Sequence, residues 1–466
     1  MATNKLLSFM KFIGMTFIMT IITLPANAQF LRTSYFMEGT HYRQQLNPAL
    51  TPTKGFINLP VIGAVNATVG STSLGYQDII DIIDDGGDFY TKPDFMNRLK
   101  DNNTLNVNFS TEILSAGWYK GKNFWSVNVG LRNDIGAAIP KTMFQFMNNM
   151  SSREFGDNIS DYLGINETIN GQKLEINSYA EVGLGFARNI TDRLAVGGKV
   201  KMLLGIGNLK LNINQIHVET PSVGSSGVTS KASIQVDATL ENSSKLLELP
   251  ENENGDYIDE IDFGSFGFAG YGGAIDLGVS YKLLDKLTLS ASVLDLGFIK
   301  WSKSNTSIAR ANTEQTYDLL DPASQQEFMD IVNSGEILNY DMLQLKTEEA
   351  SEKSRTRGLT STMVLGAEYA LLNDWLVVGA LYTGRFAKPK TLNELTFSAC
   401  IRPTNAFNVA ASYSVLQGAG KTFGLALKLG PFFAGTDYMF FGKNTKNVNA
   451  YLGVSIPLGK QKTAEN

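Results

Sequence analysis

Few residues in this chain have side chains of the kind that enzymes use for catalysis. His41 and His217 are the only histidines, and Cys400 is the only cysteine, among 466 residues. Two histidines leave no plausible zinc site and no obvious histidine-based triad. The stretch 183–188, GLGFAR, lacks the third glycine of a dinucleotide-binding fingerprint. We therefore expect no enzymatic activity, no cofactor and no metal, although the common serines leave an esterase, protease or acyltransferase open.

Residues 77–89, QDIIDIIDDGGDF, concentrate aspartates that could bind a cation. Their spacing does not fit an EF-hand loop, which needs acidic ligands at alternate positions before its glycine. A solvated helix end is the simpler interpretation. A site for calcium, or for cations that bridge lipopolysaccharide, is the alternative.

The rest of the chain repeats one pattern. The stretch 281–293, YKLLDKLTLSASV, has an aspartate between two apolar segments, and similar stretches surround Asp192, Asp374 and Asn405. On both sides of each turn residue, apolar side chains occupy every second position, with small or polar residues between them. This period of two is the signature of β-strands with one apolar face. Each repeat is therefore predicted to be a hairpin with a very short turn.

The connections between these hairpins are much longer than the turns within them. They cover about 136–172, 207–265 and 303–356, and we expect them to be polar and irregular. Short turns at one end and long loops at the other are typical of a bacterial transmembrane β-barrel. Lipid requires the sheet to close, because an open edge would leave unpaired backbone amides in hydrocarbon. A soluble β-sandwich is the alternative, but it does not explain the alternating lengths.

When the inward and outward alternation is followed along the chain, it predicts an all-β fold, an antiparallel barrel of about 14 strands. Because this number is even, both termini are expected on the periplasmic side. The stretch 231–240 would break the even count, so we assign it to a hairpin that rises from the loop 207–265. Asp295 falls on the apolar register of its strand, which favours a bulge beside Gly297. The strands are predicted near 56–70, 105–118, 123–135, 173–188, 193–207, 266–282, 286–300, 357–371, 374–387, 391–403, 406–418, 420–430, 433–443 and 447–459.

The interior of such a barrel would carry charged residues of both signs. They are Glu181, Lys199, Lys201, Asp276, Glu368 and Arg402. Because unpaired charges in a narrow lumen would be costly, we expect cross-barrel ion pairs rather than an open ring of charge. A closed or plugged lumen follows from this prediction.

Two loop segments are predicted to be short helices. Asp321 is a suitable N-cap, with Pro322 at the first helical position and Gly335 past the end. The other segment, 139–150, crowds large apolar side chains together. These side chains either pack over the barrel rim or form an adaptable patch where an apolar ligand enters. The ligand-entry candidates are Met143, Phe144, Phe146 and Met147.

The N-terminus predicts export. Residues 1–28 combine early lysines, an apolar run and Ala26-Asn27-Ala28, which together indicate a signal peptide cleaved near Ala28 and Gln29. No later apolar run approaches 18 residues, which argues against a helical membrane protein. The net charge of −5 does not suggest a nucleic-acid partner. We expect a signal peptide at 1–28, an N-terminal segment at 29–55, the barrel at 56–459 and a short tail at 460–466.

The stretches 29–50, QFLRTSYFMEGTHYRQQLNPAL, and 266–301, FGFAGYGGAIDLGVSYKLLDKLTLSASVLDLGFIKW, resemble a family of uncharacterised Bacteroidota outer-membrane barrels. That family is similar to the long-chain fatty-acid transporter (FadL-like) superfamily. The resemblance covers most of 30–459 and implies a barrel whose N-terminal segment folds into the lumen as a hatch. Asn-Pro-Ala occurs early in that superfamily; the alternative is a simple turn before the first strand. The hatch candidates are Tyr42, Arg43, Asn47, Pro48 and Ala49.

Two functions are compatible with these expectations. The first is a channel for a small hydrophobic or amphipathic compound, located in the bacterial outer membrane and surrounded by its lipid. The second is a barrel scaffold that binds secretion or cell-surface machinery. A continuous lumen bordered by apolar side chains would favour the channel, and a lumen filled by side chains would favour the scaffold.

Overall fold

The computed structural model describes most of the chain from residue 32 onward. The predicted signal peptide and most of the acidic stretch 77–89 lie outside the described residues; of the aspartates there, only Asp78 is described, and it pairs with Arg98. The described residues are 32–38, 40–58, 65–75, 78, 89–151, 153, 158–222, 230–252, 254–255, 257–258, 262–334, 343–348, 354–386, 391–416, 421–439 and 445–459.

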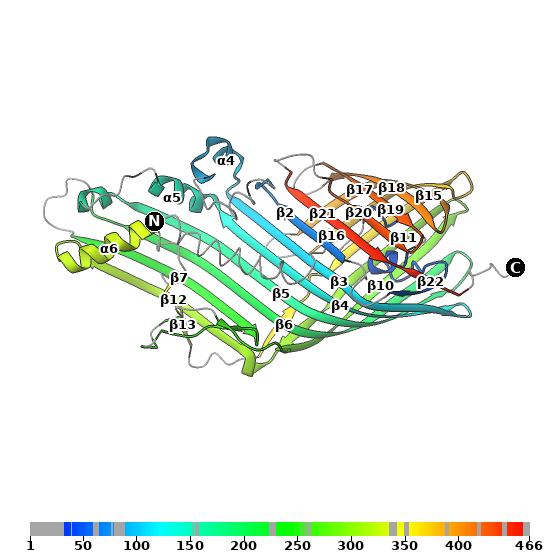
Figure 1. The fold of residues 1–466 in the computed structure, drawn as a ribbon, viewed down its shortest axis with the longest axis horizontal. Helices are drawn as coiled ribbons and strands as arrows, with labels where there is room; N and C mark the ends of the chain where they lie inside the picture. Colours follow the sequence, from blue (N-terminus) through cyan, green and yellow to red (C-terminus); the bar gives the residue numbers. More distant parts are fainter. Residues whose placement is uncertain are drawn as a thin grey trace.

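The chain forms a closed antiparallel β-barrel with fourteen positions in its wall (Figure 1). The ring closes because the first and last wall strands pair with each other. This confirms the predicted fold class, and each wall position overlaps one of the fourteen predicted strands. In order, the wall consists of β1 (Gly55–Asn58) continued by β2 (Val65–Ser71), β3 (Asn102–Lys120), β4 (Asn123–Pro140), β5 (Asn166–Asn189), β6 (Leu194–Glu219), β10 (Gly270–Leu284), β11 (Leu287–Trp301), β14 (Arg355–Gly358) continued by β15 (Thr362–Leu371), β16 (Leu376–Arg385), β17 (Leu392–Thr404), β18 (Phe407–Leu416), β19 (Thr422–Leu429), β20 (Phe432–Thr436), and β21 (Asn447–Val454) continued by β22 (Ile456–Leu458).

The short turns gather at one end of the barrel, which we call the turn end; the opposite end is the loop end. Asn373 and Asp374 form one of these turns with φ of 54° and 66°. Asparagine and aspartate adopt this left-handed conformation more readily than other residues with a side chain. Gly121 and Gly430 occupy two other turns with φ of 60° and 58°. The turn residues of the repeat at Asp374 therefore have a direct conformational cause, whereas Asp192, Asp285 and Asn405 of the other repeats do not have positive φ.

Beyond the loop end, part of the wall continues as a sheet, which we call the extension (Figure 1). β5 and β6 have 24 and 26 residues, more than twice the roughly 10 that a membrane-spanning strand needs. The end of β6 pairs with β7 (Lys231–Ser244), which pairs with β12 (Thr306–Asp318), and β12 pairs with β13 (Lys346–Thr347). The predicted hairpin at 231–240 is thus confirmed.

The prediction that the three long connections are irregular is wrong. β4, β5 and β6 extend into the first two, and β12 lies in the third. The predicted helices are confirmed as α5 (Lys141–Ser151) and α6 (Pro322–Ser334), and Asp321 accepts the backbone N–H of Ser324 at 2.9 Å. The remaining short elements are α2 (Arg43–Leu46), α4 (Pro93–Arg98), η1 (Phe89–Thr91), η2 (Ile159–Tyr162), η3 (Lys303–Asn305), β8 (Leu247–Glu248) and β9 (Asp262–Phe263).

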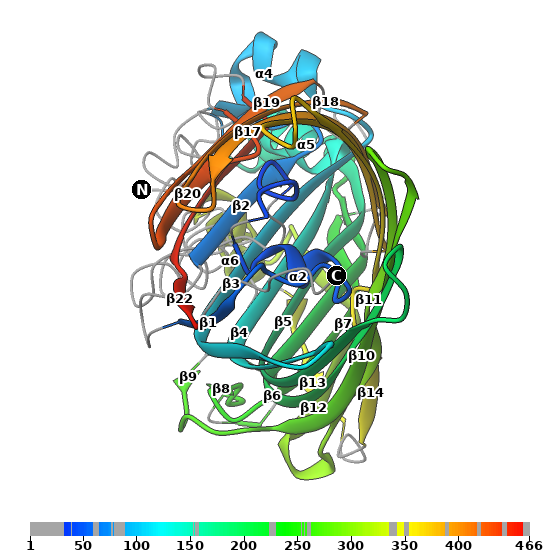
Figure 2. The ribbon, with the colours of Figure 1, turned by 90° about the vertical axis from the view of Figure 1, so that its right-hand side faces the viewer.

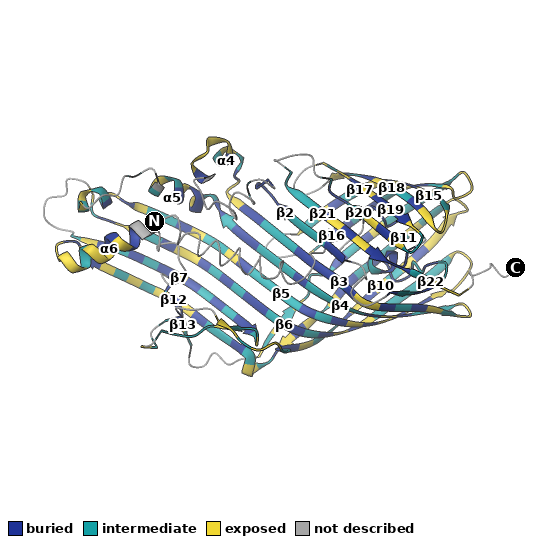
Figure 3. Cartoon of the chain, viewed as in Figure 1, coloured by how far each residue is buried: buried dark blue, intermediate teal, exposed yellow. Residues whose placement is uncertain are grey.

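The outer face of the wall is apolar over a height that suits a membrane. Along β10, exposed apolar side chains occupy every second position from Ile275 to Tyr281, and Tyr271 is exposed in the same register beyond Gly273; Figure 3 shows such alternation along the strands. Ten residues at about 3.3 Å each, on a strand tilted by about 40°, span about 25 Å, the height of the apolar band of transmembrane barrels. Exposed aromatic rings at both ends of the strand match the interfacial girdles of such barrels.

Among the described residues, no helix combines the length and apolarity needed to cross a membrane.

A bulge in β11 preserves this apolar face. Ile275 pairs with Leu296 and Leu277 pairs with Val293, so two residues, Leu294 and Asp295, lie opposite one. Asp295 has φ of 58° and is buried. The bulge predicted from the sequence is therefore present, two residues before Gly297 rather than beside it. It moves the outward register from odd to even positions and turns Asp295 into the lumen.

Candidate functional site

Residues 32–54, which we call the inner segment, lie inside the barrel toward the turn end. Figure 2 looks along the barrel and shows α2, the helical turn of this segment, within the ring of strands. Its large side chains are almost completely buried: Tyr35, Phe36, Met37, Tyr42 and Leu46. They pack against lumen-facing residues of the wall, which are Leu294, Val364, Val377, Leu381, Cys400, Ala410, Ala426, Phe433 and Tyr451. This half of the lumen is therefore apolar where these side chains pack, although the sequence predicted only small or polar residues there.

Glycines of the wall make room for the inner segment. A Cβ atom on Gly379 would lie 2.3 Å from the ring of Phe36, and one on Gly366 would lie 3.0 Å from the ring of Tyr35. A side chain at Gly379 would therefore force the Phe36 ring to move, and one at Gly366 would require the Tyr35 ring to shift by a few tenths of an ångström. The same holds on other strands; the lumen-facing glycines in contact with the inner segment are Gly197, Gly278, Gly366, Gly379 and Gly424. The glycines between the apolar positions of the strands thus shape a surface for this segment.

The tripeptide Asn47-Pro48-Ala49 is the tightest part of this contact. The Asn47 side-chain oxygen accepts the Ala49 N–H at 2.9 Å, which forms a local turn. The Asn47 amide donates to the backbone carbonyls of Val279 and Ala291, at 3.1 and 3.2 Å, on β10 and β11. Pro48 lies against Gly197, where a Cβ atom would be 2.5 Å from the Pro48 carbonyl. The tripeptide is both a turn and a contact to three wall strands.

A shared carboxylate connects the inner segment to β15 and β17. Arg43 and Arg402 each lie 3.1 Å from the Glu368 carboxylate, and Arg402 also donates to the Phe36 carbonyl at 3.2 Å. Burial alone would lower the pKa of Arg43, but Glu368 and Glu38 outweigh it and raise the pKa, so this guanidinium stays charged. We call Arg43, Arg402 and Glu368 the arginine clamp.

The other predicted lumen charges meet in a second network. Lys201 lies 2.8 Å from Asp276, 2.6 Å from Asp295 and 4.0 Å from Glu181, and Glu181 also pairs with Arg132 at 3.2 Å. Lys199 is the cross-strand partner of Asp276 in the register of β6 and β10. Five of the six predicted charges are in ion pairs, as the sequence predicted; for Lys199 the structure gives only this register position. The pairs of these six residues join strands one or two positions apart, or the inner segment, so for them the expectation of pairs across the barrel is wrong; a pair across the lumen joins Arg385 on β16 to Asp134 on β4.

His41 of the inner segment joins two distant parts of the wall. Its ring nitrogens lie 2.8 Å from the Ser455 hydroxyl and 2.9 Å from the Glu112 carboxylate, and its ring stacks on Phe56 at 3.9 Å. Serine, histidine and glutamate have the composition of a catalytic triad, but all three side chains are buried in this packing. The arrangement connects the inner segment to β3 and to the residue between β21 and β22. Sequence reasoning missed it because 414 residues separate His41 from Ser455.

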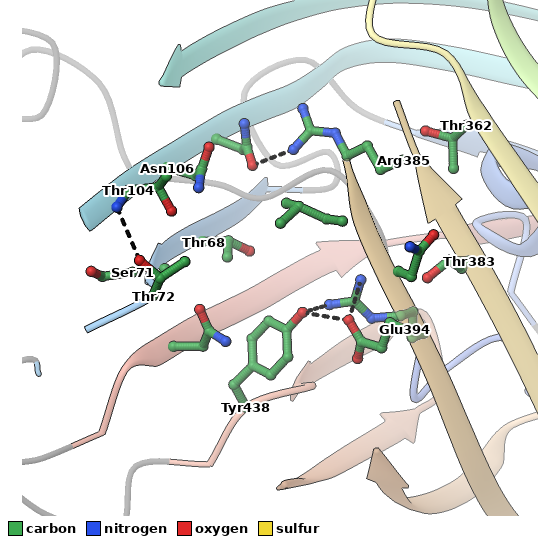
Figure 4. Close-up of a pocket in the computed structure, with 16 residues that line it drawn as sticks. Thr68, Ser71, Thr72, Thr104, Asn106, Thr362, Thr383, Arg385, Glu394 and Tyr438 are labelled. Atoms are coloured by element: carbon green, nitrogen blue, oxygen red, sulfur yellow. Dashed lines mark hydrogen bonds and ion pairs between the residues drawn. The ribbon is translucent and has the colours of Figure 1, made fainter. Parts of the chain in front are cut away.

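Above the inner segment, the loop-end half of the lumen holds a polar pocket (Figure 4). Its cavity volume is about 90 Å³, or about 800 Å³ when the space open to solvent is included. Its hydroxyl-bearing lining residues, apart from Tyr438, are Thr68, Ser71, Thr72, Thr104, Thr362 and Thr383. Its amides are Asn106, Asn108, Asn393 and Asn447. The signal in the sequence was the alternation of Thr104, Asn106 and Asn108 on a strand, which indicates a polar face but not which strands share it.

Arg32, the first described residue of the inner segment, belongs to the floor of this pocket. Its guanidinium pairs with Glu394 at 3.1 Å, and it donates to the Tyr438 hydroxyl and lies over that ring. Burial alone would lower the pKa of Arg32, but Glu394 and its neighbours outweigh it and raise the pKa. Across the pocket, Arg385 pairs with Asp134 at 2.6 Å. A ligand in the pocket would therefore touch the inner segment directly.

The ligand-entry candidates lie elsewhere, in the core of the extension. Met143, Phe144, Phe146 and Met147 on α5 are buried to between 2 and 7 % exposure. They pack against residues such as Phe95, whose ring meets Phe144 at 5.4 Å. This placement favours packing over the rim, the alternative weighed from the sequence.

Fold and site together define a closed, membrane-type β-barrel with its own N-terminal segment in the lumen. A family model described as a family of unknown function (DUF5723) matches residues 48–437, and the chain belongs to this family. No curated protein matches the chain.

Solved structures with a similar fold include channels of the class that the sequence resembles. The toluene transporter TbuX of Ralstonia pickettii has 10 % identity and a TM-score of 0.42, over 94 % of this chain and 100 % of that one. The toluene transporter TodX of P. putida has 11 % identity and a TM-score of 0.40, over 94 % and 100 %. A FadL homologue of Pseudomonas aeruginosa has 10 % identity and a TM-score of 0.35, over 93 % and 96 %. Similarity at this level does not assign a function to the chain.

Proposed function

We propose that the protein is a channel of the bacterial outer membrane, exported by a signal peptide cleaved near Ala28 and Gln29. In this proposal the inner segment is the hatch of the channel, and the polar pocket receives the compound from outside. The observation that carries the proposal is that the solvent-open pocket ends on Arg32, so the compartment that a ligand can enter and the segment that fills the lumen share a residue.

The inner segment is held by contacts that can be exchanged without unfolding the wall. Its links to the wall are ion pairs, hydrogen bonds and packing against glycines, such as the Tyr35 hydroxyl with Ser290 at 2.8 Å. The ring of strands closes through β2 with β21 and β1 with β22, without any residue of the inner segment. Movement of this segment would therefore open the lumen while the barrel stays closed.

The pocket also bears on the kind of compound. From the sequence we expected a small hydrophobic or amphipathic ligand. Most of the lining residues carry a hydroxyl or an amide, and a wholly apolar ligand would leave those that lack a partner among the described residues, such as Thr104 and Thr362, unsatisfied at a cost for each buried group. We therefore propose an amphipathic compound whose polar part binds in the pocket.

A scaffold for secretion or surface machinery is the second candidate, and the extension is the observation that favours it. Its sheet carries a hydrophobic core of its own beyond the membrane band, with α5 and α6 packed on it. A channel has no evident need for so large an external sheet, whereas a docking platform does.

A permeability assay tests the channel against the scaffold. Gly197→Ala places a methyl group against Pro48 of the inner segment, whereas Gly198→Ala, on the opposite face of β6, meets no atom closer than 3.4 Å. Intact cells that make each variant are given a small chromogenic substrate hydrolysed only in the periplasm. The channel predicts faster hydrolysis with Gly197→Ala than with Gly198→Ala or the unchanged protein. Equal rates, with equal amounts of folded protein in the outer membrane, would favour the scaffold.

A further inference from the structure

We propose that the lumenal pocket recognises a neutral, hydroxyl-rich group of the saccharide type. This inference deepens the proposed channel function and rests on it for its biological meaning. It concerns the part of the ligand that the pocket holds, and it is carried by the chemistry of the lining residues.

Two hydroxyls of the pocket have a hydrogen-bonding capacity that the described residues do not use. Thr362 is completely buried and Thr104 is 5 % exposed. Neither side-chain oxygen has a hydrogen-bond partner among the described residues, and both residues line the pocket. Buried polar groups are normally satisfied, so a buried hydroxyl that lines a pocket without a partner indicates a ligand with donors or acceptors of its own.

The balance of charge in the pocket argues for a neutral partner. Arg32 is paired with Glu394 and Arg385 with Asp134, so each guanidinium already has a carboxylate within 3.1 Å. An anionic ligand would have to compete with these carboxylates, and a cationic ligand with the arginines. A neutral ligand leaves both ion pairs intact.

Hydroxyls and amides are the groups that recognise polyols, because both can donate and accept hydrogen bonds. A saccharide hydroxyl has the same dual character, so many pairings satisfy both sides. The lining also presents apolar surface, to which Leu392 and the methyl groups of its threonines can contribute and which suits the C–H faces of a sugar ring. The cavity volume of about 90 Å³ is below the usual range for whole small-molecule ligands, which is about 300–1,000 Å³, so the pocket suits one end group of a ligand whose remainder extends into the space open to solvent.

The test is isothermal titration of the full mature chain in lipid nanodiscs with three neutral trisaccharides: maltotriose, cellotriose and chitotriose. We expect at least one to bind. The double variant Thr104→Val and Thr362→Val keeps the side-chain volumes but removes both hydroxyls, and should weaken that binding about tenfold or more, because each lost hydrogen bond costs a factor of about 2–12. Thr313→Val is the matched control, since it removes a hydroxyl that also lacks a partner among the described residues, but on β12 in the extension. It should leave the affinity unchanged.

Three results would overturn the inference: no heat from any trisaccharide at about 10 mM, the upper end of weak specific binding; equal affinity in the unchanged protein and the double valine variant; or an equal loss with Thr313→Val. The permeability assay separates this failure from failure of the channel. If Gly197→Ala increases permeability while all titrations are flat, the channel stands and the ligand class is wrong.

Discussion

Replacing Gly197 by alanine should loosen the inner segment without disturbing the barrel wall. The added Cβ atom would lie 2.5 Å from the carbonyl carbon and oxygen of Pro48 and 2.6 Å from the Ala49 nitrogen. These are backbone atoms, which cannot rotate away as a flexible side chain can. Overpacking of this kind costs about 1–3 kcal/mol. Because the wall strand is fixed by pairing on both sides, most of this cost should fall on the docked state of the inner segment.

Hydrogen exchange measures this loosening directly. Several amides of the segment are protected by local hydrogen bonds, such as the Asn47 N–H to the Arg43 carbonyl at 3.0 Å. If exchange requires undocking, a cost of 1–3 kcal/mol raises the exchange rate about 5–150-fold. We expect peptides that cover residues 40–50 to exchange faster by this factor in Gly197→Ala, in nanodiscs, while peptides from β17 and β18 keep their rates.

Gly198→Ala is the control on the neighbouring residue. Its Cβ atom would point outward and lie 3.4 Å from the Asp276 carbonyl, an ordinary contact. Both variants replace glycine by alanine in the same strand, so effects on the unfolded chain cancel in the comparison. A cost of overpacking of at least about 1 kcal/mol would raise the exchange rate at least about fivefold. If the exchange rates of the inner segment differ by no more than about twofold between the two variants, the contact with Gly197 does not hold this segment.

Three further predictions concern the membrane face, the arginine clamp and the extension. Leu277→Arg should lower the folding yield in bilayers, because Leu277 lies on the lipid face midway between Tyr271 and Tyr281 and a charge at mid-depth costs about 2–4 kcal/mol, whereas Thr288→Arg places its charge in the lumen beside Glu368; equal yields would refute this register. Glu368→Gln should lower the thermal midpoint and increase protease access to the inner segment, because removing one partner of a buried pair costs about 3–5 kcal/mol; an unchanged midpoint and cleavage rate would show that the clamp is not needed. Burial alone would raise the pKa of Glu241 in the extension, but Arg355 and its neighbours lower it below its ordinary value of 4.5. The stability from this carboxylate is therefore present above about pH 4.5 and is lost as the pH falls through the lower, folded-state pKa. Thermal unfolding between pH 6 and 3 should show a smaller acid-induced loss in Glu241→Gln, and identical pH profiles would contradict it.

The wall of the barrel could be predicted because its signals are local. The period of two, the turn at Asn373 and Asp374 and the out-of-register Asp295 each depend on residues close together in the chain. The bulge at Asp295 was readable because a charged residue on a lipid-facing register requires a local explanation. The even number of wall strands could then be predicted because lipid requires any spanning sheet to close into a barrel.

The extension and the pocket could not be predicted because their signals are weak or distant. β12 consists largely of polar and small residues, so its alternation resembles a loop in composition. The pocket brings Arg32 to Glu394, 362 positions away in the chain, and only the order and tilt of the strands determine that contact. Lumen-facing Val377 and Leu381 also broke the expected polar pattern, because what they face is the inner segment rather than water.

Ion conductance across planar bilayers tests most directly the claim that the inner segment closes this barrel. The mature full-length chain is compared with a variant that lacks residues 32–50, and both are checked for a folded barrel by their β-sheet circular dichroism. We predict a closed state for the full-length protein, with at most brief openings, and a large, steady conductance for the deletion variant. A large, steady conductance from the full-length protein, or no increase from the folded deletion variant, would contradict the account.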